Sequence, residues 1–242
     1  MLKIENVEVA GWEAAIRGMR NPKNSWAKSD SHWDYVNQGP EYLTVAHFDD
    51  ADFNIGPNDK KLMSTLRNAG TDHRKFMRMI TVYLDITAPL YWWKEFDTYK
   101  VGTVANSCST MHKIAAKEFT LEDFNCEHLC DDELELLKEI IARLNMNRIV
   151  FIAKDDKRVD RYSVMTDECY AKYKKKLWWQ MIQLLPSSYN QKRTVMLNYE
   201  VLANIYKSRR HHKLDEWHTL CDWIESLPYS ELITSKEEKA DV

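Results

Sequence analysis

The stretch of residues 88–112 is the part of the sequence that most constrains the fold. Its first half is rich in aromatic and charged residues and begins with Ala88-Pro89, which predicts a helix because proline suits a first turn. Its second half, residues 101–112, consists mainly of small hydroxyl and amide residues such as Asn106 and Ser107. Such a run does not suit a helix packed in a core. It does suit a segment whose backbone approaches a ligand closely. We therefore expect a helix that leads directly into a ligand-binding loop.

The composition is that of a globular protein. The chain has 242 residues, of which 44% are hydrophobic and 29% charged, so it is long enough to bury a substantial core. No apolar run approaches the roughly 20 residues of a membrane-spanning helix, and residues 1–6 lack the pattern of a signal peptide. We expect a cytoplasmic protein with no membrane partner, organised as one domain over residues 1–242.

Charge and glycine content exclude several functional classes. The net charge is −3, so no global basic field attracts nucleic acid, and we do not expect a nucleic-acid partner. The lysine run at residues 172–176 is interpreted as a solvated helix face. The chain has only six glycines and neither a Walker nor a Rossmann fingerprint.

The cysteine pattern gives little support to a metal site. Five cysteines in a chain without an export signal are expected to be reduced. Cys126 and Cys130 flank His128, but zinc sites usually pair such a cluster with a second one, and none is present. We therefore expect no metal. The tryptophan pairs 92–93 and 178–179 are interpreted as core or interface residues.

Hydrophobic periodicity predicts a helix-rich α/β protein. Strands are expected at 1–9 and 76–87. Helices are expected at 11–19, from a cap at Asn58-Asp59 to Gly70, and at 131–144, 168–185, 196–208 and 215–227. Residues 153–164 are expected to be solvated, and residues 235–242 are expected to form a frayed charged tail.

Two separated segments carry a family pattern. The first segment contains His73, Ala88-Pro89, Lys94-Glu95, Thr98-Tyr99-Lys100 and then the small polar run. The number of residues from His73 to Ala88-Pro89 matches the family motif. In the second, Leu185-Pro186 precedes a segment in which Asn198, Leu202, Asn204 and Arg209 keep the spacing of a family motif, with His211-His212-Lys213 after it. Together they cover roughly 90 residues, and their spacing resembles that of the flavin-dependent thymidylate synthases.

The resemblance implies a fold and an activity. The fold would be helix-rich with a central, mostly antiparallel sheet, and the family is homotetrameric with flavin sites at subunit interfaces. The activity would be transfer of a one-carbon unit from methylenetetrahydrofolate to dUMP, with FAD as cofactor and NADPH as reductant. The flavin carries the chemistry, while the protein supplies position and charge.

The resemblance also implies roles for particular residues. The cofactor-binding residues would be His73, Lys100, Asn106, Asn198, Asn204 and His212. The substrate-binding residues would be Glu95, Ser107, Ser109, Arg193 and Arg209, with Arg209 also catalytic. Asn198 and Asn204 are both expected inside a helix, where asparagine is unfavourable, and this local inconsistency favours function over packing.

The chain also departs from the family pattern where the pattern holds phosphate. Thr98 and Met111 stand in place of arginines, Tyr99 in place of a histidine, and Ile182 in place of a further arginine. Each charge-assisted hydrogen bond contributes about 1.5–3 kcal/mol, so other cations such as Lys113 and Lys192 would have to replace them. The leading hypothesis is an enzyme of this class, with an altered pyrimidine nucleotide as a possible substrate. The alternative is a catalytically inactive homologue that binds a nucleotide or a protein.

Overall fold

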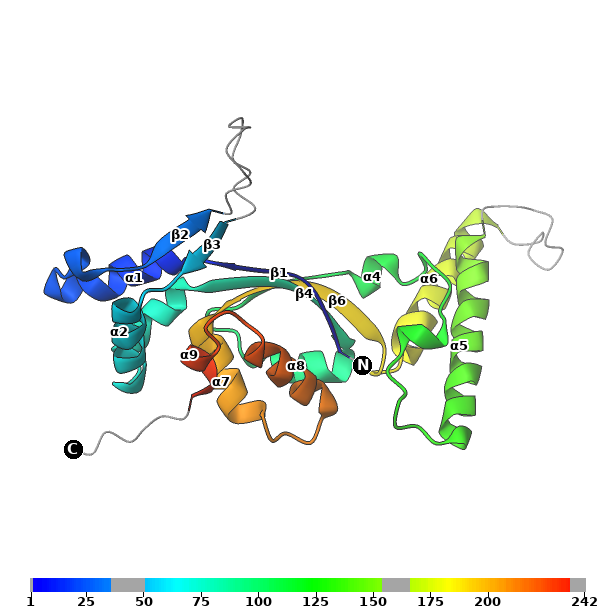
Figure 1. Cartoon of the computed structure of the whole chain (residues 1–242). Coiled ribbons are helices and arrows are strands. Elements are labelled where there is room, and N and C mark those ends of the chain that lie inside the picture. Colours follow the sequence, from blue (N-terminus) through cyan, green and yellow to red (C-terminus); the bar gives the residue numbers. More distant parts are fainter. Residues whose placement is uncertain (1, 36–50, 154–165, 236–242) are drawn as a thin grey trace, which may run out of the picture. The chain divides into compact units, whose positions relative to one another are not determined.

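The computed structural model describes residues 2–35, 51–153 and 166–235 and has a helix-rich α/β fold (Figure 1). Within these residues, a four-stranded antiparallel sheet has the strand order β1-β4-β6-β5. Its strands are β1 (Lys3–Ala10), β4 (Thr81–Pro89), β6 (Asn190–Asn198) and β5 (Val104–Ser107). A second, two-stranded sheet pairs β2 (His32–Tyr35) antiparallel with β3 (Ala51–Asn54), and His32 lies opposite Asn54.

The described residues fall into two compact units, each drawn from segments distant in sequence. Unit 1 takes its residues from Met1–Glu5, Asp85–Thr98 and Ala105–Val195. Unit 2 takes its residues from Asn6–Leu84, Tyr99–Val104 and Met196–Val242. Strands β1, β4 and β6 contribute residues to both units. The prediction of a single domain over residues 1–242 stays a prediction.

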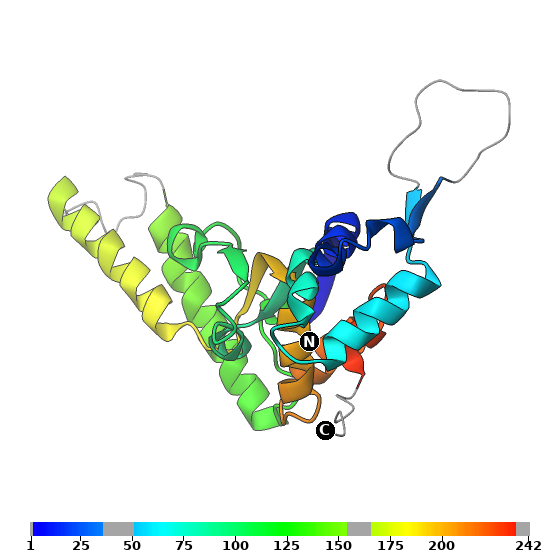
Figure 2. The same cartoon turned by 90° about the vertical axis from the view of Figure 1, so that its left-hand side faces the viewer.

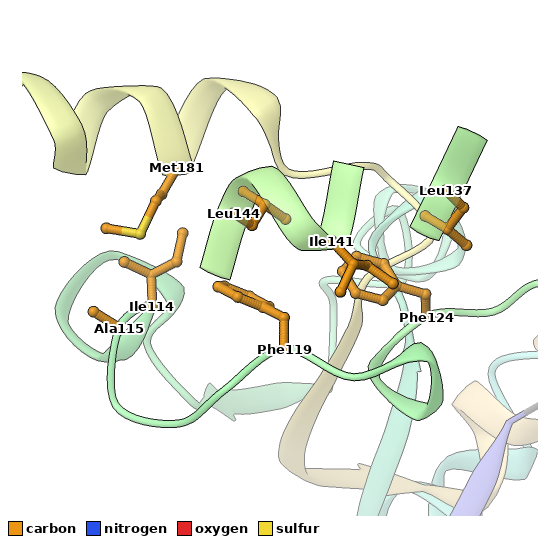
Figure 3. Close-up of a cluster of buried hydrophobic side chains, with 8 residues drawn as sticks. All are labelled: Ile114, Ala115, Phe119, Phe124, Leu137, Ile141, Leu144 and Met181. Carbon is orange, nitrogen blue, oxygen red and sulfur yellow. The ribbon is translucent and has the colours of Figure 1, made fainter. Parts of the chain in front are cut away.

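Unit 1 is dominated by two long helices, which lie side by side in Figures 1 and 2. Its helices are α3 (Leu90–Phe96), α4 (Thr110–Lys113), α5 (Asp131–Ile152) and α6 (Asp167–Leu184). Figure 3 shows how Leu137, Ile141 and Leu144 of α5 meet Phe119 and the other side chains of a buried apolar cluster. This cluster holds the loop after α4 against the two long helices.

Unit 2 packs its helices around an aromatic core. The elements of this unit are α1 (Trp12–Arg20), α2 (Pro57–Asn68), a 3-10 helix η4 (Arg74–Met79), α7 (Tyr199–Arg209), α8 (Asp215–Glu225) and α9 (Glu231–Thr234). The ring of Trp12 meets those of Tyr199 and Tyr229 edge-on, each at 5.2 Å between centroids. All three aromatic rings thereby join α1 to the C-terminal helices.

The strongly periodic helices were predicted correctly. Helices α6 and α8 lie within a few residues of their predicted bounds, and α5 begins at Asp131 as expected. Helix α5 continues to Ile152, beyond the predicted end at Leu144. Trp92 and Trp93 are buried, as predicted for core residues. Residues 154–164 and 236–242, for which the sequence predicts a solvated segment and a charged tail, lie outside the described residues.

Several predicted boundaries were wrong because tertiary contacts outweigh local pattern. The strand predicted at 76–87 is the 3-10 helix η4 followed by β4, and Ala88-Pro89 ends β4 instead of lying inside α3. Gly56, not Asn58-Asp59, precedes α2. The helix predicted from Met196 begins at Tyr199, after a strand β6 that the sequence analysis missed.

In residues 2–35, 51–153 and 166–235, no helix combines the length and the apolar character needed to cross a bilayer.

Candidate functional site

The segment of residues 88–112 folds as a helix, a turn, a strand and a short helix, in that order. Helix α3 ends at Phe96, a turn follows, and the expected small-polar loop is partly β5. Asn106 and Ser107 lie in β5 with exposed side chains. Ser109 precedes α4 and its hydroxyl accepts a hydrogen bond from the His112 N–H at 3.1 Å.

A cavity of about 390 Å³ opens beside α4 in unit 1. Its walls come from Thr87, from residues between 108 and 123, and from residues 189–192, and we call it the α4 pocket. Ile114 and Phe119 line it and also belong to the apolar cluster of Figure 3. The pocket therefore has a rigid apolar floor, and its volume lies in the range of roughly 300–1,000 Å³ typical of small-molecule sites.

Three lysines and two acids, Glu122 and Asp123, line the α4 pocket. Lys117 is paired with Asp123, which raises the pKa of the lysine. Lys192 lies 3.0 Å from Asp85, and this hydrogen-bonded carboxylate raises the lysine pKa. Lys113 lines the pocket and makes no ion pair with any residue that the structure describes. Lys113 is thus the pocket lysine whose charge is least compensated by the protein.

Polar groups from the start of β6 complete the α4 pocket. Gln191 is buried and its Nε2 donates to the Cys108 carbonyl at 2.9 Å, which ties β6 to the segment before α4. Burial raises the pKa of Tyr189, whose ring packs edge-on against Phe124 at 5.6 Å. Asn190 lines the pocket, and its buried Oδ1 has no hydrogen-bond partner among the described residues.

Arg193, a predicted substrate-binding residue, is held by protein groups in unit 1. Its Nη1 donates to Asp97 at 2.8 Å and its Nε donates to the Gln191 side chain at 3.0 Å. The guanidinium also lies over the Trp93 ring, 4.2 Å from the centroid. These contacts fix Arg193 firmly, because planar guanidinium groups both stack and pair. The predicted Glu95 lies half-buried on α3 in the same unit.

In unit 2, helix α7 holds the turn that carries Lys100. Asn198 lies at the N-terminus of α7, where its Oδ1 accepts from the Val201 N–H at 3.1 Å and its Nδ2 donates to the Gly102 carbonyl at 3.4 Å. Gly102 has φ +80°, and a Cβ there would lie 2.9 Å from the Asn198 Nδ2. The expectation that Asn198 lies inside a helix was wrong, since this side chain is the helix cap.

Arg209 binds the other end of the same turn. Its Nε donates to the Tyr99 hydroxyl at 2.9 Å, and its guanidinium lies over the Trp217 ring at 4.7 Å from the centroid. His212 meets the same Trp217 ring edge-on at 6.2 Å. Three predicted site residues, Asn198, Arg209 and His212, are therefore brought around the Tyr99–Val104 turn and Trp217.

The remaining predicted residues of unit 2 are exposed. His73 precedes η4, Lys100 lies in the turn between α3 and β5, and Asn204 lies on the outer face of α7. Next to Lys100, the buried Thr103 hydroxyl has no partner among the described residues. An ammonium group, a hydroxyl and the Asn198 amide thus lie around one turn, and groups of these kinds bind phosphate.

Sequence reasoning missed several of these residues. Lys117, Tyr189 and Asn190 line the α4 pocket, and none of them is among the site residues predicted from the sequence. Trp217, which packs under Arg209, was assigned only to an amphipathic helix. No local signal identifies them, because each becomes notable only through a neighbour distant in sequence. The described residues contain no group of three or more His, Cys, Asp or Glu side chains placed to hold a metal ion.

The fold belongs to a known class. The architecture is that of the flavin-dependent thymidylate synthases, as the sequence predicted. Thymidylate Synthase X (ThyX) from Helicobacter pylori, solved with FAD and dUMP, superposes with a TM-score of 0.58 at 13% identity, covering 98% of this chain and 98% of that chain. A second H. pylori ThyX structure, complexed with FAD and dUMP, gives 0.56 at 14% identity and covers 97% of this chain and 98% of that chain.

A nucleotide methylase also has a similar fold. The UMP/dUMP methylase PolB from Streptomyces cacaoi, bound with 5-Br dUMP, gives a TM-score of 0.51 at 10% identity, covering 93% of this chain and 89% of that chain. No protein-family model and no curated protein matches the chain. The comparisons therefore show a ThyX-like fold and leave the reaction to be inferred from the site.

Proposed function

We propose that the protein is a flavin-dependent enzyme that methylates a pyrimidine nucleotide, as a divergent member of the flavin-dependent thymidylate synthase family. The observation that carries the proposal is the α4 pocket. It lies beside the segment in which the family signature is recognised, in a chain with a ThyX-like fold. Its apolar floor and its least compensated lysine, Lys113, suit a ring that bears a phosphate.

In this proposal, FAD supplies the redox chemistry, methylenetetrahydrofolate the one-carbon unit and NADPH the reducing equivalents. The protein binds and orients. The FAD ligands are assigned to His73, Lys100, Asn106, Asn198, Asn204 and His212. The substrate ligands are assigned to Glu95, Ser107, Ser109, Arg193 and Arg209, of which Ser109 lines the α4 pocket. The protein is assigned to the cytoplasm as a homotetramer, the state in which the family completes its flavin sites.

Arg209 is the residue assigned to catalysis. Its guanidinium is already oriented by the Tyr99 hydroxyl and the Trp217 ring, so little rotamer freedom remains to be lost on binding a pyrimidine. A fixed cation beside a pyrimidine ring stabilises negative charge that develops on the ring oxygens.

The first experiment measures flavin directly. The purified protein is expected to be yellow, or to bind added FAD in a titration that follows the flavin absorbance. A colourless protein that fails to bind FAD would sink the proposal. With FAD bound, NADPH oxidation measured with and without dUMP, and tritium release from dUMP labelled at ring position 5, test the substrate and the transfer.

Arg209→Ala tests the catalytic assignment. The variant is expected to lose nucleotide-dependent turnover by about a hundredfold or more, as for loss of one oriented charge-stabilising donor. Arg210→Ala is the matched control, because Arg210 follows directly and pairs with Asp222 and Glu225 on α8. Equal turnover in Arg209→Ala and wild type would remove Arg209 from the mechanism.

A non-catalytic homologue remains the second candidate. Arg193 and Arg209 both contact protein groups, and two signature positions hold Thr98 and Tyr99 in place of cationic residues. Such a protein would bind a nucleotide or a protein partner without turnover. Nucleotide binding without NADPH oxidation or tritium release would favour this candidate.

A further inference from the structure

We propose that Asn190 recognises the imide edge of a uracil ring in the α4 pocket, while Lys113 binds the phosphate of the same nucleotide. The inference deepens the proposed function and rests on it for the substrate class. It begins from Asn190, which lines the α4 pocket and whose buried Oδ1 has no partner among the described residues.

A buried carbonyl oxygen without a donor is unfavourable, so native structures rarely retain one. The other nearby polar group on β6 is already committed, because Gln191 accepts from Arg193 and donates to the Cys108 carbonyl. The Asn190 Oδ1 can therefore accept a hydrogen bond from a water or, when a nucleotide enters the α4 pocket, from a ligand N–H.

A primary amide carries an acceptor and a donor side by side. The imide edge of uracil carries an N–H flanked by carbonyl oxygens, so it can pair with both groups of Asn190 at once. The rings of Phe119 and Tyr189 line the same cavity and pack edge-on at 6.1 Å, which holds them in place. The pocket thus combines fixed aromatic walls with one free amide.

The charge of the pocket indicates where the phosphate binds. Lys117 and Lys192 have carboxylate partners in unit 1, namely Asp123 for the first and Asp85 for the second. Lys113 has none among the residues described. Binding of a phosphate to Lys113 requires no existing ion pair to break.

Cys108 provides a probe of the α4 pocket that needs no turnover. Its side chain is exposed and lines the pocket, whereas Cys130 and Cys169 are exposed but do not line it. In the full-length protein, alkylation of each cysteine is followed by mass spectrometry with increasing dUMP, dCMP or deoxyuridine. We expect dUMP to slow alkylation of Cys108 and to leave Cys130 and Cys169 unchanged.

Asn190→Asp tests the recognition of the base. A carboxylate still accepts from the uracil N3–H or the cytosine amino group, but it cannot donate to the neighbouring uracil carbonyl or cytosine N3 and repels it. The concentrations of dUMP and of dCMP that protect Cys108 should therefore both rise about tenfold or more, as expected for an unpaired polar contact. Gln180→Glu is the control, since it introduces the same charge on the exposed face of α6. Unchanged protection by dUMP in Asn190→Asp would overturn the assignment of Asn190.

Lys113→Ala tests the phosphate. It should weaken protection by dUMP about tenfold, as for loss of a charge-assisted contact, and leave protection by deoxyuridine unchanged. Lys138→Ala, on the exposed face of α5, is the control. Equal weakening of dUMP and deoxyuridine would overturn the role of Lys113. If Asn190→Asp does not fold, Asn190→Ser replaces it, and unchanged dUMP protection in that variant would overturn the inference.

The outcomes separate this inference from the proposed function. Flavin-dependent turnover of dUMP without protection of Cys108 would overturn the inference and leave the proposed function standing. Protection of Cys108 that depends on Asn190, in a protein that binds no FAD, would support the inference and overturn the flavin-dependent reaction.

Discussion

At the scale of single residues, Asn198 shows how one side chain can be misassigned. Its position in a predicted helix interior suggested a functional reason for an unfavourable residue. The structure gives a structural reason, because Asn198 caps α7 and binds the turn at Gly102. Asparagine is among the preferred residues at such a cap. A role toward FAD would have to use the hydrogen-bonding capacity that remains on this amide.

Replacement of Asn198 separates capping from any role in cofactor binding. Asn198→Ala should lower the free energy of unfolding by about 1 kcal/mol, because a helix N–H loses its acceptor. Asn198→Ser should keep most of the stability, since serine also caps. Urea denaturation measures both variants, and FAD titration of the serine variant then reports the amide alone. Equal stability of the alanine variant and wild type would contradict the capping role.

At the scale of elements, α5 shows what periodicity predicts well. Leu137, Ile141 and Leu144 recur at helical spacing and are buried, as the sequence predicted. The same helix exposes Leu136 at 56%, which a pattern of apolar residues alone does not distinguish. The buried face matters because two members of the same cluster, Ile114 and Phe119, line the α4 pocket.

A pair of leucine variants tests the buried face of α5. Leu144→Ala removes a side chain that is 0% exposed and should lower the free energy of unfolding by about 2–5 kcal/mol through lost burial and a cavity. Leu136→Ala, on the exposed side, should change it by less than about 0.5 kcal/mol. Chemical denaturation followed by circular dichroism compares them. Similar losses in the two variants would show that α5 is oriented differently.

A buried ion pair joins α1 and α2 in unit 2. Arg20 Nε donates to Asp59 at 2.6 Å, and both side chains are buried. The hydroxyls of Ser29 and Ser31 also donate to Asp59, each at 2.7 Å. Burial opposes ionisation, but the hydrogen bonds from Ser31, Ser29 and Arg20 outweigh it and hold the pKa of Asp59 below its usual value.

The lowered pKa of Asp59 predicts a pH dependence. A carboxyl whose folded pKa is depressed contributes stability above its unfolded pKa of about 3.9, and that stability is lost as pH falls through the folded pKa. Asp59→Asn should therefore flatten the loss of stability below about pH 4. The same substitution should lower the free energy of unfolding by about 3–5 kcal/mol at neutral pH, because Arg20 stays buried without its partner. Asp222→Asn removes a carboxylate from an exposed ion pair with Arg210 and should leave the loss of stability at acid pH unchanged. Denaturation at several pH values compares the two variants with the wild type.

At the scale of the whole molecule, the proposed function requires a bound flavin. A ligand that binds only the folded state stabilises it by about 2.7 kcal/mol at one hundred times its Kd. FAD should therefore raise the thermal midpoint by several degrees, and riboflavin, which lacks the phosphates and the adenosine, should raise it less. Differential scanning fluorimetry makes the comparison. An unchanged midpoint at saturating FAD would contradict the cofactor assignment, and light scattering of the same samples tests the homotetramer.

The sequence by itself determined the class of fold and the strongly periodic elements. The spacing from His73 to Ala88-Pro89 and from Asn198 to Arg209 identified the fold, because spacing persists when side chains change. Helices α5, α6 and α8 followed from apolar residues at helical spacing, which local chemistry is sufficient to define.

Three features could be recognised only from the tertiary structure, namely β6, the cap at Asn198 and the α4 pocket. The first half of β6 is polar, so no apolar alternation marks it, and its strand form depends on pairing with β4 and β5. The α4 pocket combines Cys108 and Lys113 with Asn190, which lies far along the chain. Such a site is defined by contacts between distant segments, and a local pattern carries no information about those contacts.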